Sequence, residues 1–146
     1  MPQIRRAEAS WQGDLLSGQG QVSARTSGVF SDLPVSWGAR TEAHGGKTSP
    51  EELLAAAHAA CFSMAFSNML AKAGTPPERL EVSAEVAFDK VGDGWKVVSS
   101  VLTVQGTVPG IDEATFREVA ERAKDGCPIS SAIKGNVELS VEATLA

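Results

Sequence analysis

Residues 53–71 are apolar on almost every side and rich in alanine, and they constrain the fold more than any other segment. Ser49 and Pro50 precede them, as is typical of a helix start, and Gly74 follows them, as is typical of a helix end. This pattern predicts one helix ending at about Ala73, about 24 residues or roughly 36 Å long. A helix that is apolar all round is buried on most sides, and its alanines allow another backbone to approach closely.

The rest of the chain predicts strands and two shorter helices. Alternating apolar residues predict strands around Trp11 and over residues 21–30, 80–89, 95–108 and 137–145. Helices are expected over residues 113–124 and 128–133, where an aspartate and a proline provide helix starts. The predicted fold class is α+β, with antiparallel β-sheet strands packed around a long buried central helix. The length of 146 residues predicts a single domain spanning residues 1–146.

Composition excludes several kinds of partner. The net charge is −5, the sequence has no tyrosine, and only 5% of residues are aromatic, so nucleic acid and anionic membranes are not expected as partners. His58 and Asn68 interrupt the apolar stretch, which favours a buried helix over a membrane span. The N-terminus lacks the apolar run of a secretory signal, which predicts a cytoplasmic protein.

Two cysteines are the first candidates for chemistry. Both could simply be small buried apolar residues, which is common for free cysteine. However, Cys127 lies at the start of a predicted helix, where the helix dipole favours a thiolate. Cys61 lies in the middle of the long helix and needs a cation from elsewhere to ionise. Arg40 precedes that helix and is a candidate cation, although it could also be a solvated loop charge.

No motif indicates a cofactor or a metal. Gly46, Lys47 and Thr48 resemble the end of a phosphate-binding loop, but Thr41 occupies the position of the required first glycine. The two histidines and two cysteines do not have the spacing of a zinc framework. We therefore expect neither a cofactor nor a metal.

Three segments closely resemble the OsmC/Ohr family of thiol peroxidases. They are residues 48–64 (TSPEELLAAAHAACFSM), residues 108–112 (VPGID) and residues 123–130 (AKDGCPIS). The resemblance extends from Arg40 to the C-terminus. The His–Ala–Ala–Cys motif in the first segment is similar to that of the OsmC branch, osmotically inducible protein C, rather than to the Ohr branch.

This resemblance implies reduction of organic hydroperoxides, with hydrogen peroxide as a second candidate substrate. Cys61 matches the peroxide-attacking cysteine, Cys127 the resolving cysteine and Glu51 the glutamate of the site. The site arginine matches Arg40 in OsmC-like sequences, whereas Arg25 is the nearest candidate for the Ohr-like position; we favour Arg40. The resemblance also implies an external dithiol reductant and an intertwined homodimer with sites at the subunit interface.

Helix geometry adds an expectation of its own. Glu51 and Cys61 are ten residues apart, which is about 15 Å along a straight helix and about 80° around it. They cannot touch within one straight helix, so if Glu51 and Arg40 serve Cys61, they should come from a second subunit, or the helix must bend. Two other functions stay open: a non-catalytic protein that binds a small apolar ligand, and a redox sensor that signals through its disulfide.

Overall fold

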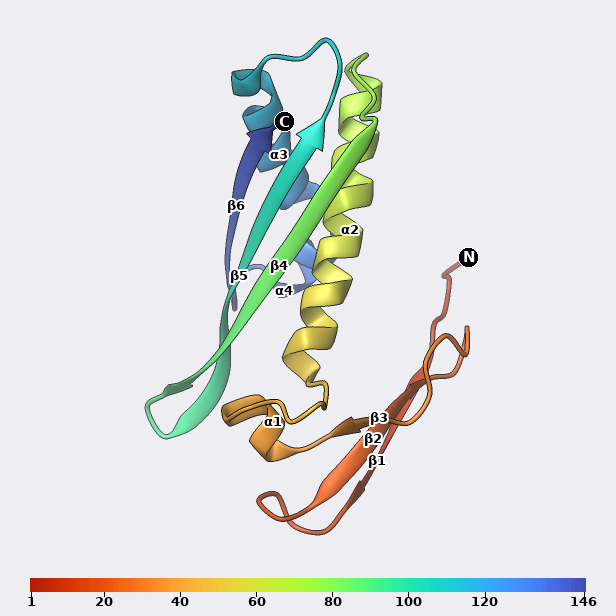
Figure 1. The fold of residues 1–146 in the computed structure, drawn as a ribbon, viewed down its shortest axis with the longest axis vertical. Coiled ribbons are helices and arrows are strands. Elements are labelled where there is room, and N and C mark those ends of the chain that lie inside the picture. The colour runs from red at the N-terminus through yellow and green to blue at the C-terminus, as the bar shows by residue number, and fades with distance from the viewer. The chain divides into compact units, whose positions relative to one another are not determined.

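A computed structural model describes all residues from 1 to 146, which form two compact units (Figure 1). We call Met1–Pro50 the N-terminal unit and Glu51–Ala146 the C-terminal unit. Each unit is described by itself below. The expectation of a single domain over residues 1–146 stays a prediction.

The N-terminal unit is a small antiparallel sheet followed by a short helix. Its strands are β1 (Ala7–Gln12), β2 (Gln19–Ala24) and β3 (Leu33–Val35), paired in that order, and helix α1 spans Trp37–Thr41. Strand β2 ends earlier than predicted, because the chain turns back after it through Gly28, whose φ of 68° lies in the left-handed region. The segment β3 and helix α1 were not predicted, since both are too short to show a period.

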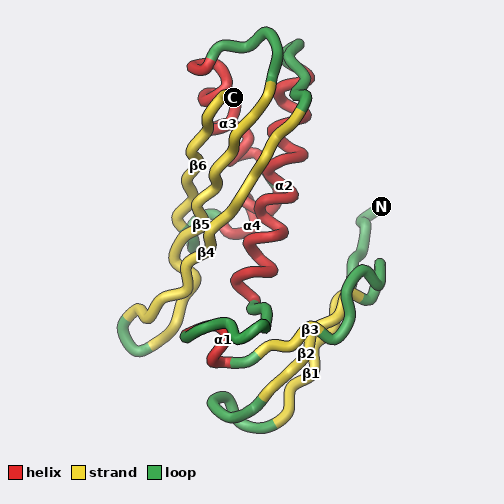
Figure 2. Tube along the Cα trace, in the orientation of Figure 1, coloured by secondary structure: helices red, strands yellow, loops and turns green.

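The C-terminal unit contains a second three-stranded sheet. Strands β4 (Arg79–Val91) and β5 (Gly94–Thr107) form a long antiparallel hairpin, and β6 (Glu138–Leu145) pairs with β5. Figure 2 shows the three strands side by side. The α+β class is confirmed, but β6 runs parallel to β5 rather than antiparallel. The reason is the connection between the two strands. Helices α3 (Glu113–Gly126) and α4 (Pro128–Ile133) bring the chain back to the end of the sheet from which β5 runs, so β6 follows the same direction as β5.

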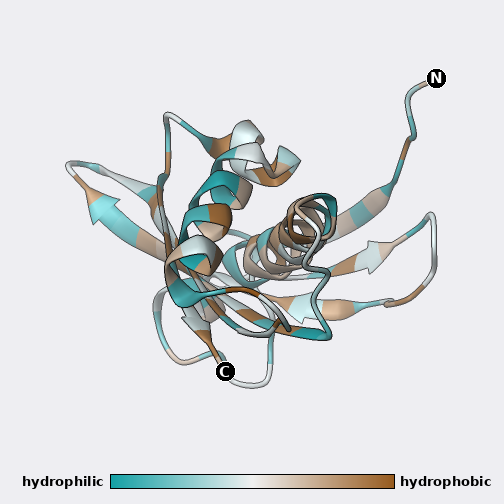
Figure 3. Ribbon diagram, turned by 90° about the horizontal axis from the view of Figure 1, so that it is seen from above, coloured by the Kyte–Doolittle hydropathy of each residue, from teal (hydrophilic) through white to brown (hydrophobic).

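The long helix α2 spans Pro50–Lys72, which confirms the helix predicted from the apolar stretch. One face is buried, and it repeats every four residues at His58, Phe62, Phe66 and Leu70. The opposite face is exposed, with Met64 69% exposed. In Figure 3, coloured by hydropathy, the helix carries brown and pale residues together with some teal ones. The predicted burial on most sides is therefore incomplete within one chain.

Length and composition alone would allow α2 to cross a membrane, a property that core helices of other proteins share, and 22% of its most apolar window is buried.

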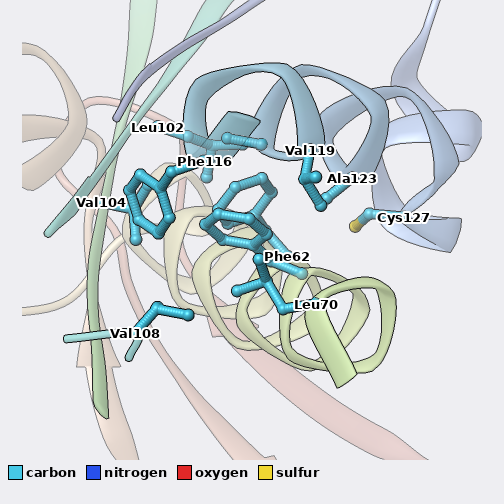
Figure 4. Close-up of a cluster of buried hydrophobic side chains, with 11 residues drawn as sticks. Phe62, Leu70, Leu102, Val104, Val108, Phe116, Val119, Ala123 and Cys127 are labelled. Atoms are coloured by element: carbon cyan, nitrogen blue, oxygen red, sulfur yellow. The ribbon is translucent and has the colours of Figure 1, made fainter. Parts of the chain in front are cut away.

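A core of aromatic and aliphatic side chains holds α2 and α3 against one face of the second sheet (Figure 4). The rings of Phe66 and Phe116 lie 5.0 Å apart between their centroids. Gly106 of β5 faces Phe116, and a Cβ at this glycine would lie only 2.7 Å from the Phe116 ring. The core continues to Cys127, which is fully buried at its edge.

Candidate active site

Cys61 and Cys127 meet in the C-terminal unit although 66 positions separate them in sequence. Both are free thiols, and they lie close enough for Cys127 to raise the pKa of Cys61. They differ in accessibility: Cys127 is fully buried, whereas Cys61 is partly exposed. Cys61 borders an open apolar pocket of about 570 Å³, which Met64, Met69 and Pro128 also line. A small molecule can therefore reach Cys61 more easily than Cys127.

The immediate surroundings of Cys61 favour the neutral thiol. Burial raises the pKa of Cys61 most, and the neighbouring Cys127 thiol raises it further. The backbone N–H of Ile129 acts in the opposite direction but is outweighed. No cation of the C-terminal unit lowers the pKa of Cys61. The C-terminal unit thus positions Cys61 without activating it, because the thiolate is the nucleophilic form of cysteine.

The position of Cys127 is set by the joint between two helices. Cys127 follows the last residue of α3, and its N–H donates to the Ala123 carbonyl at 2.9 Å. It also precedes α4, whose first backbone hydrogen bond joins the Ser131 N–H to the Cys127 carbonyl at 3.0 Å. The predicted place of Cys127 at a helix start is confirmed, and Pro128 occupies the first position of α4.

His58 is a residue of this region that the sequence did not single out as part of the site. It is fully buried one helical turn before Cys61. Its Nδ1 lies 2.7 Å from Ser100 Oγ on β5, and its Nε2 lies 2.8 Å from Ser130 Oγ on α4. Burial lowers the pKa of His58, which favours the neutral ring. The available signal was the three-residue spacing between His58 and Cys61, which places both on one helix side.

Arg40 lies in α1 of the N-terminal unit beside an apolar pocket. Its guanidinium carbon is 5.5 Å from the centre of the Trp37 ring, a cation–π geometry. The pocket measures about 350 Å³, and its other lining residues are mostly apolar: Trp11, Leu15, Val35, Trp37 and Pro50. The sequence did not predict this pocket, because its walls come from three separate segments. An apolar cavity with one cation suits a ligand with an apolar body and a polar or anionic group.

The other two predicted site residues occupy different settings. Arg25 pairs with Glu8 across β1 and β2, at 2.7 Å between Arg25 Nε and Glu8 Oε2, and both side chains are largely exposed. Glu51 lies in the first turn of α2 and is only 7% exposed. Because α2 is one continuous helix, Glu51 and Cys61 stay ten residues apart along it. The roles of Arg40, Arg25 and Glu51 stay predictions.

The second histidine has a local role. His44 Nδ1 accepts the Gly46 N–H at 2.9 Å within the loop before α2. Neither His44 nor His58 belongs to a group of three or more His, Cys, Asp or Glu side chains that could hold a metal ion. The loop of Gly45 and Gly46 has two residues in the left-handed region, with φ of 57° and 80°.

Comparison with known proteins shows the family to which this chain is similar. The family model of the OsmC-like proteins matches residues 43–142. Peroxiredoxin OsmC of Escherichia coli K12 is 42% identical over 138 residues, covering 94% of this chain and 95% of that protein. The organic hydroperoxide resistance protein of Xanthomonas axonopodis pv. citri is 30% identical over 100 residues, covering 68% of each.

The fold is also found among solved structures. The crystal structure of the organic hydroperoxide resistance protein OhrB of Bacillus subtilis superposes with a TM-score of 0.75 at 26% identity, covering 95% of this chain and 98% of that one. The higher identity to an OsmC protein than to an Ohr protein agrees with the predicted branch. The chain therefore belongs to the OsmC-like family, as a cysteine-based peroxidase.

Proposed function

We propose that this protein reduces organic hydroperoxides to alcohols, with Cys61 as the attacking cysteine and Cys127 as the resolving cysteine. One observation carries this assignment of roles. The two thiols are neighbours that affect each other electrostatically, yet only Cys61 borders an open pocket, while Cys127 is fully buried. A peroxide therefore meets Cys61 first, and the oxidised Cys61 sulfur already has Cys127 beside it.

The reaction takes three balanced steps. The Cys61 thiolate attacks one oxygen of the peroxide bond, and the alcohol leaves after taking up a proton, so that Cys61 becomes a sulfenic acid. Cys127 attacks the sulfenic sulfur, and water leaves as the disulfide forms. An external dithiol then reduces the disulfide and is itself oxidised, which restores both thiols. We place the protein in the cytoplasm, where such dithiols are kept reduced.

Arg40 supplies the activation that the C-terminal unit lacks. The surroundings of Cys61 raise its pKa and include no cation, so a guanidinium from outside this unit is needed to hold the thiolate. The same cation would stabilise the alkoxide that develops as the peroxide bond breaks. Its apolar pocket suits the carbon chain of an organic hydroperoxide. Arg25 is a weaker candidate, because its side chain is largely exposed and does not line the apolar pocket beside Arg40.

Glu51 orients the arginine of the site in this proposal. A carboxylate and a guanidinium can pair through two parallel hydrogen bonds, which fixes the plane of the arginine. Glu51 lies about 15 Å along α2 from Cys61, so an arginine held by Glu51 cannot also serve the Cys61 of the same straight helix. We therefore assign the Arg40 and Glu51 that serve each Cys61 to a second copy of the chain.

A homodimer also accounts for the exposed side of α2. Apolar residues such as Ala56, Ala60 and Met64 face solvent in the single chain, together with Asn68. Small alanine side chains allow a second helix to approach closely, and burying this face would remove a continuous apolar stripe from water. The pocket beside Cys61, which Ala60 and Met64 also line, would then lie at the subunit interface. In the proposed dimer α2 is the buried central helix that the sequence predicts.

Counting thiols tests the assignment directly. The reduced protein is mixed with one equivalent of an organic hydroperoxide, and free thiols are titrated. Wild-type protein should lose both thiols, Cys61→Ser should lose none, and Cys127→Ser should lose only Cys61, as a sulfenic acid that dimedone traps. If Cys61→Ser still reduced the hydroperoxide at the wild-type rate, the proposed roles would be wrong.

The same experiment separates the two other functions. A non-catalytic protein that binds an apolar ligand would keep both thiols after peroxide treatment. A redox sensor would form the disulfide but would not turn over with any dithiol. Steady-state turnover of organic hydroperoxides against hydrogen peroxide, over a panel of dithiols, then identifies the preferred peroxide and the reductant.

A further inference from the structure

The buried His58 lies in a chain of hydrogen bonds that the proposed reaction leaves unexplained. Ser100, His58 and Ser130 are all fully buried, and both ring nitrogens of His58 are paired with a serine hydroxyl. Buried polar side chains lower stability unless each of them is hydrogen-bonded, and apolar side chains in the same positions would not need such partners. The arrangement therefore calls for a role besides packing.

The His58–Ser130 hydrogen bond lies next to the cysteine pair, as the sequence spacing shows. His58 precedes Cys61 by three residues on α2, and Ser130 of α4 follows Cys127, the residue before that helix, by three residues. His58 contacts Ser130, and Cys61 lies beside Cys127. The two contacts are thus separated by three residues on both segments, about 4.5 Å along a helix. A shift of α4 along α2 would lengthen both contacts together.

The third residue fixes the ring itself. Ser100 lies in β5, the central strand of the second sheet, and its hydroxyl holds His58 Nδ1 at 2.7 Å. The ring therefore cannot turn away from Ser130 without leaving Ser100. Burial lowers the pKa of His58, so the ring stays neutral and keeps one donor and one acceptor for the two hydroxyls. Ser100 orients the ring. Ser130 lies on α4, the short helix that begins directly after Cys127.

We propose that the His58–Ser130 hydrogen bond is a positioning contact for the resolving step, holding Cys127 beside the Cys61 sulfur so that disulfide formation outruns overoxidation. His58 and Ser130 touch neither the peroxide nor the reacting sulfurs in this proposal. They act through the position of α4. The inference rests on the proposed roles of Cys61 and Cys127. It adds that the rate of disulfide formation between them depends on the buried hydrogen bond between His58 and Ser130.

The competing outcomes for an oxidised Cys61 give a measurable readout. A sulfenic acid that Cys127 does not reach quickly reacts with a second peroxide to give sulfinic acid, in which the sulfur is oxidised by a further two electrons and the peroxide is reduced to alcohol. Weaker positioning of Cys127 therefore lowers the rate of disulfide formation and raises the sulfinic fraction at excess peroxide. The first attack on the peroxide should change much less, because Cys127 does not react in that step.

Ser130→Ala and Ser100→Ala form a matched pair of variants. Each removes one buried hydroxyl and leaves one ring nitrogen of His58 without its partner, so a merely structural role predicts similar losses in both. Our proposal predicts that Ser130→Ala slows disulfide formation about tenfold or more in single-turnover mixing with an organic hydroperoxide. Sulfinic acid on Cys61 should rise in parallel by mass spectrometry. Ser100→Ala keeps the His58–Ser130 hydrogen bond and loses only the contact that orients the ring, so it should slow disulfide formation clearly less than Ser130→Ala does.

Two histidine variants repeat the comparison if Ser130→Ala does not fold. The amide of glutamine reaches about as far as Nε2 of histidine, and the shorter amide of asparagine about as far as Nδ1. His58→Gln should therefore keep the contact with Ser130 and most of the resolving rate, whereas His58→Asn should lose both. Equal resolving rates in all variants, or equal slowing in both members of a pair, would overturn the inference. Wild-type protein that forms no Cys61–Cys127 disulfide would instead refute the proposed function.

Discussion

The two units of the molecule handle their apolar residues in opposite ways. The C-terminal unit closes a core around Phe62, Phe66 and Phe116, and it carries both thiols. The N-terminal unit buries only Gly20 and Ser23 fully and leaves Leu15, Leu16 and Val29 in solvent.

The chemistry divides along the same line. The well-packed unit holds Cys61 next to Cys127 but raises the pKa of Cys61. The loosely packed unit carries Arg40, a cation beside an apolar pocket. The comparison shows that the packed core brings the two sulfurs together, whereas the arginine that we propose as the activating charge lies in the other unit. In the proposed mechanism activity depends on assembly, and the tests below address each side of the division.

The largest difference between the units should be in stability. Phe116→Ala removes a fully buried ring that packs on Phe66 and Gly106, and it should lower the free energy of unfolding by about 3–5 kcal/mol. Leu16→Ala, at a side chain that is 78% exposed, should change it by less than about 0.5 kcal/mol. Urea unfolding followed by circular dichroism measures both. Similar losses would show that the N-terminal unit hides a core of its own.

The division of chemistry predicts a large effect of Arg40 on the rate. Arg40→Gln should lower kcat/KM for an organic hydroperoxide by about 10²–10³-fold, a range typical of removing one preorganised donor to a developing negative charge. It should also move the pH–rate profile to higher pH, because the Cys61 thiol loses the cation that opposes its raised pKa. Arg25→Gln is the matched control and should stay within about twofold of wild type. If Arg25→Gln lost activity and Arg40→Gln kept it, Arg25 would be the arginine of the site, as in the Ohr-like arrangement.

The dependence on assembly is tested on the exposed face of α2. Asn68→Glu places a charge about 10 Å along the helix from Cys61, at the surface that the proposed dimer buries. A buried unpaired charge costs several kcal/mol, so the dimer should dissociate at micromolar concentration. Peroxidase activity should be lost while both thiols remain titratable. Asn68→Gln keeps the size without the charge and should keep the dimer; sedimentation measures both. A fully active monomer would refute the proposed shared site.

The smallest expected effect concerns pH and the buried histidine. Burial lowers the pKa of His58 below its ordinary value of 6.5, so the unfolded chain binds this proton at a higher pH than the folded chain. The stability that His58 contributes is therefore present above about pH 6.5 and lost as the pH falls below it, by up to about 1.4 kcal/mol per pH unit. His58→Gln should flatten this slope in urea unfolding between pH 7.5 and 5. His44→Gln is the control that removes the other histidine, from an exposed loop.

Local sequence determined most of the elements. The proline and glycine that bound the apolar stretch gave α2 nearly its observed length, and two-residue alternation gave β4, β5 and β6. These signals act between neighbours in the chain, so they can be read without tertiary information. Alternation carries no strand direction, however, and for that reason the parallel pairing of β6 with β5 was missed. The short β3 and α1 were missed because neither completes a period.

The sequence, through its resemblance to the OsmC/Ohr family, also supplied the candidate residues of the site: two cysteines, an arginine ahead of the helix and a glutamate in its first turn. Only the tertiary structure decided that Cys61 is the accessible thiol and Cys127 the buried one, since burial depends on how α3 and α4 cover the end of the core. It also brought Ser100, His58 and Ser130 together from β5, α2 and α4. Contacts between residues so far apart in sequence leave no periodic trace, because they arise from packing whole elements against one another.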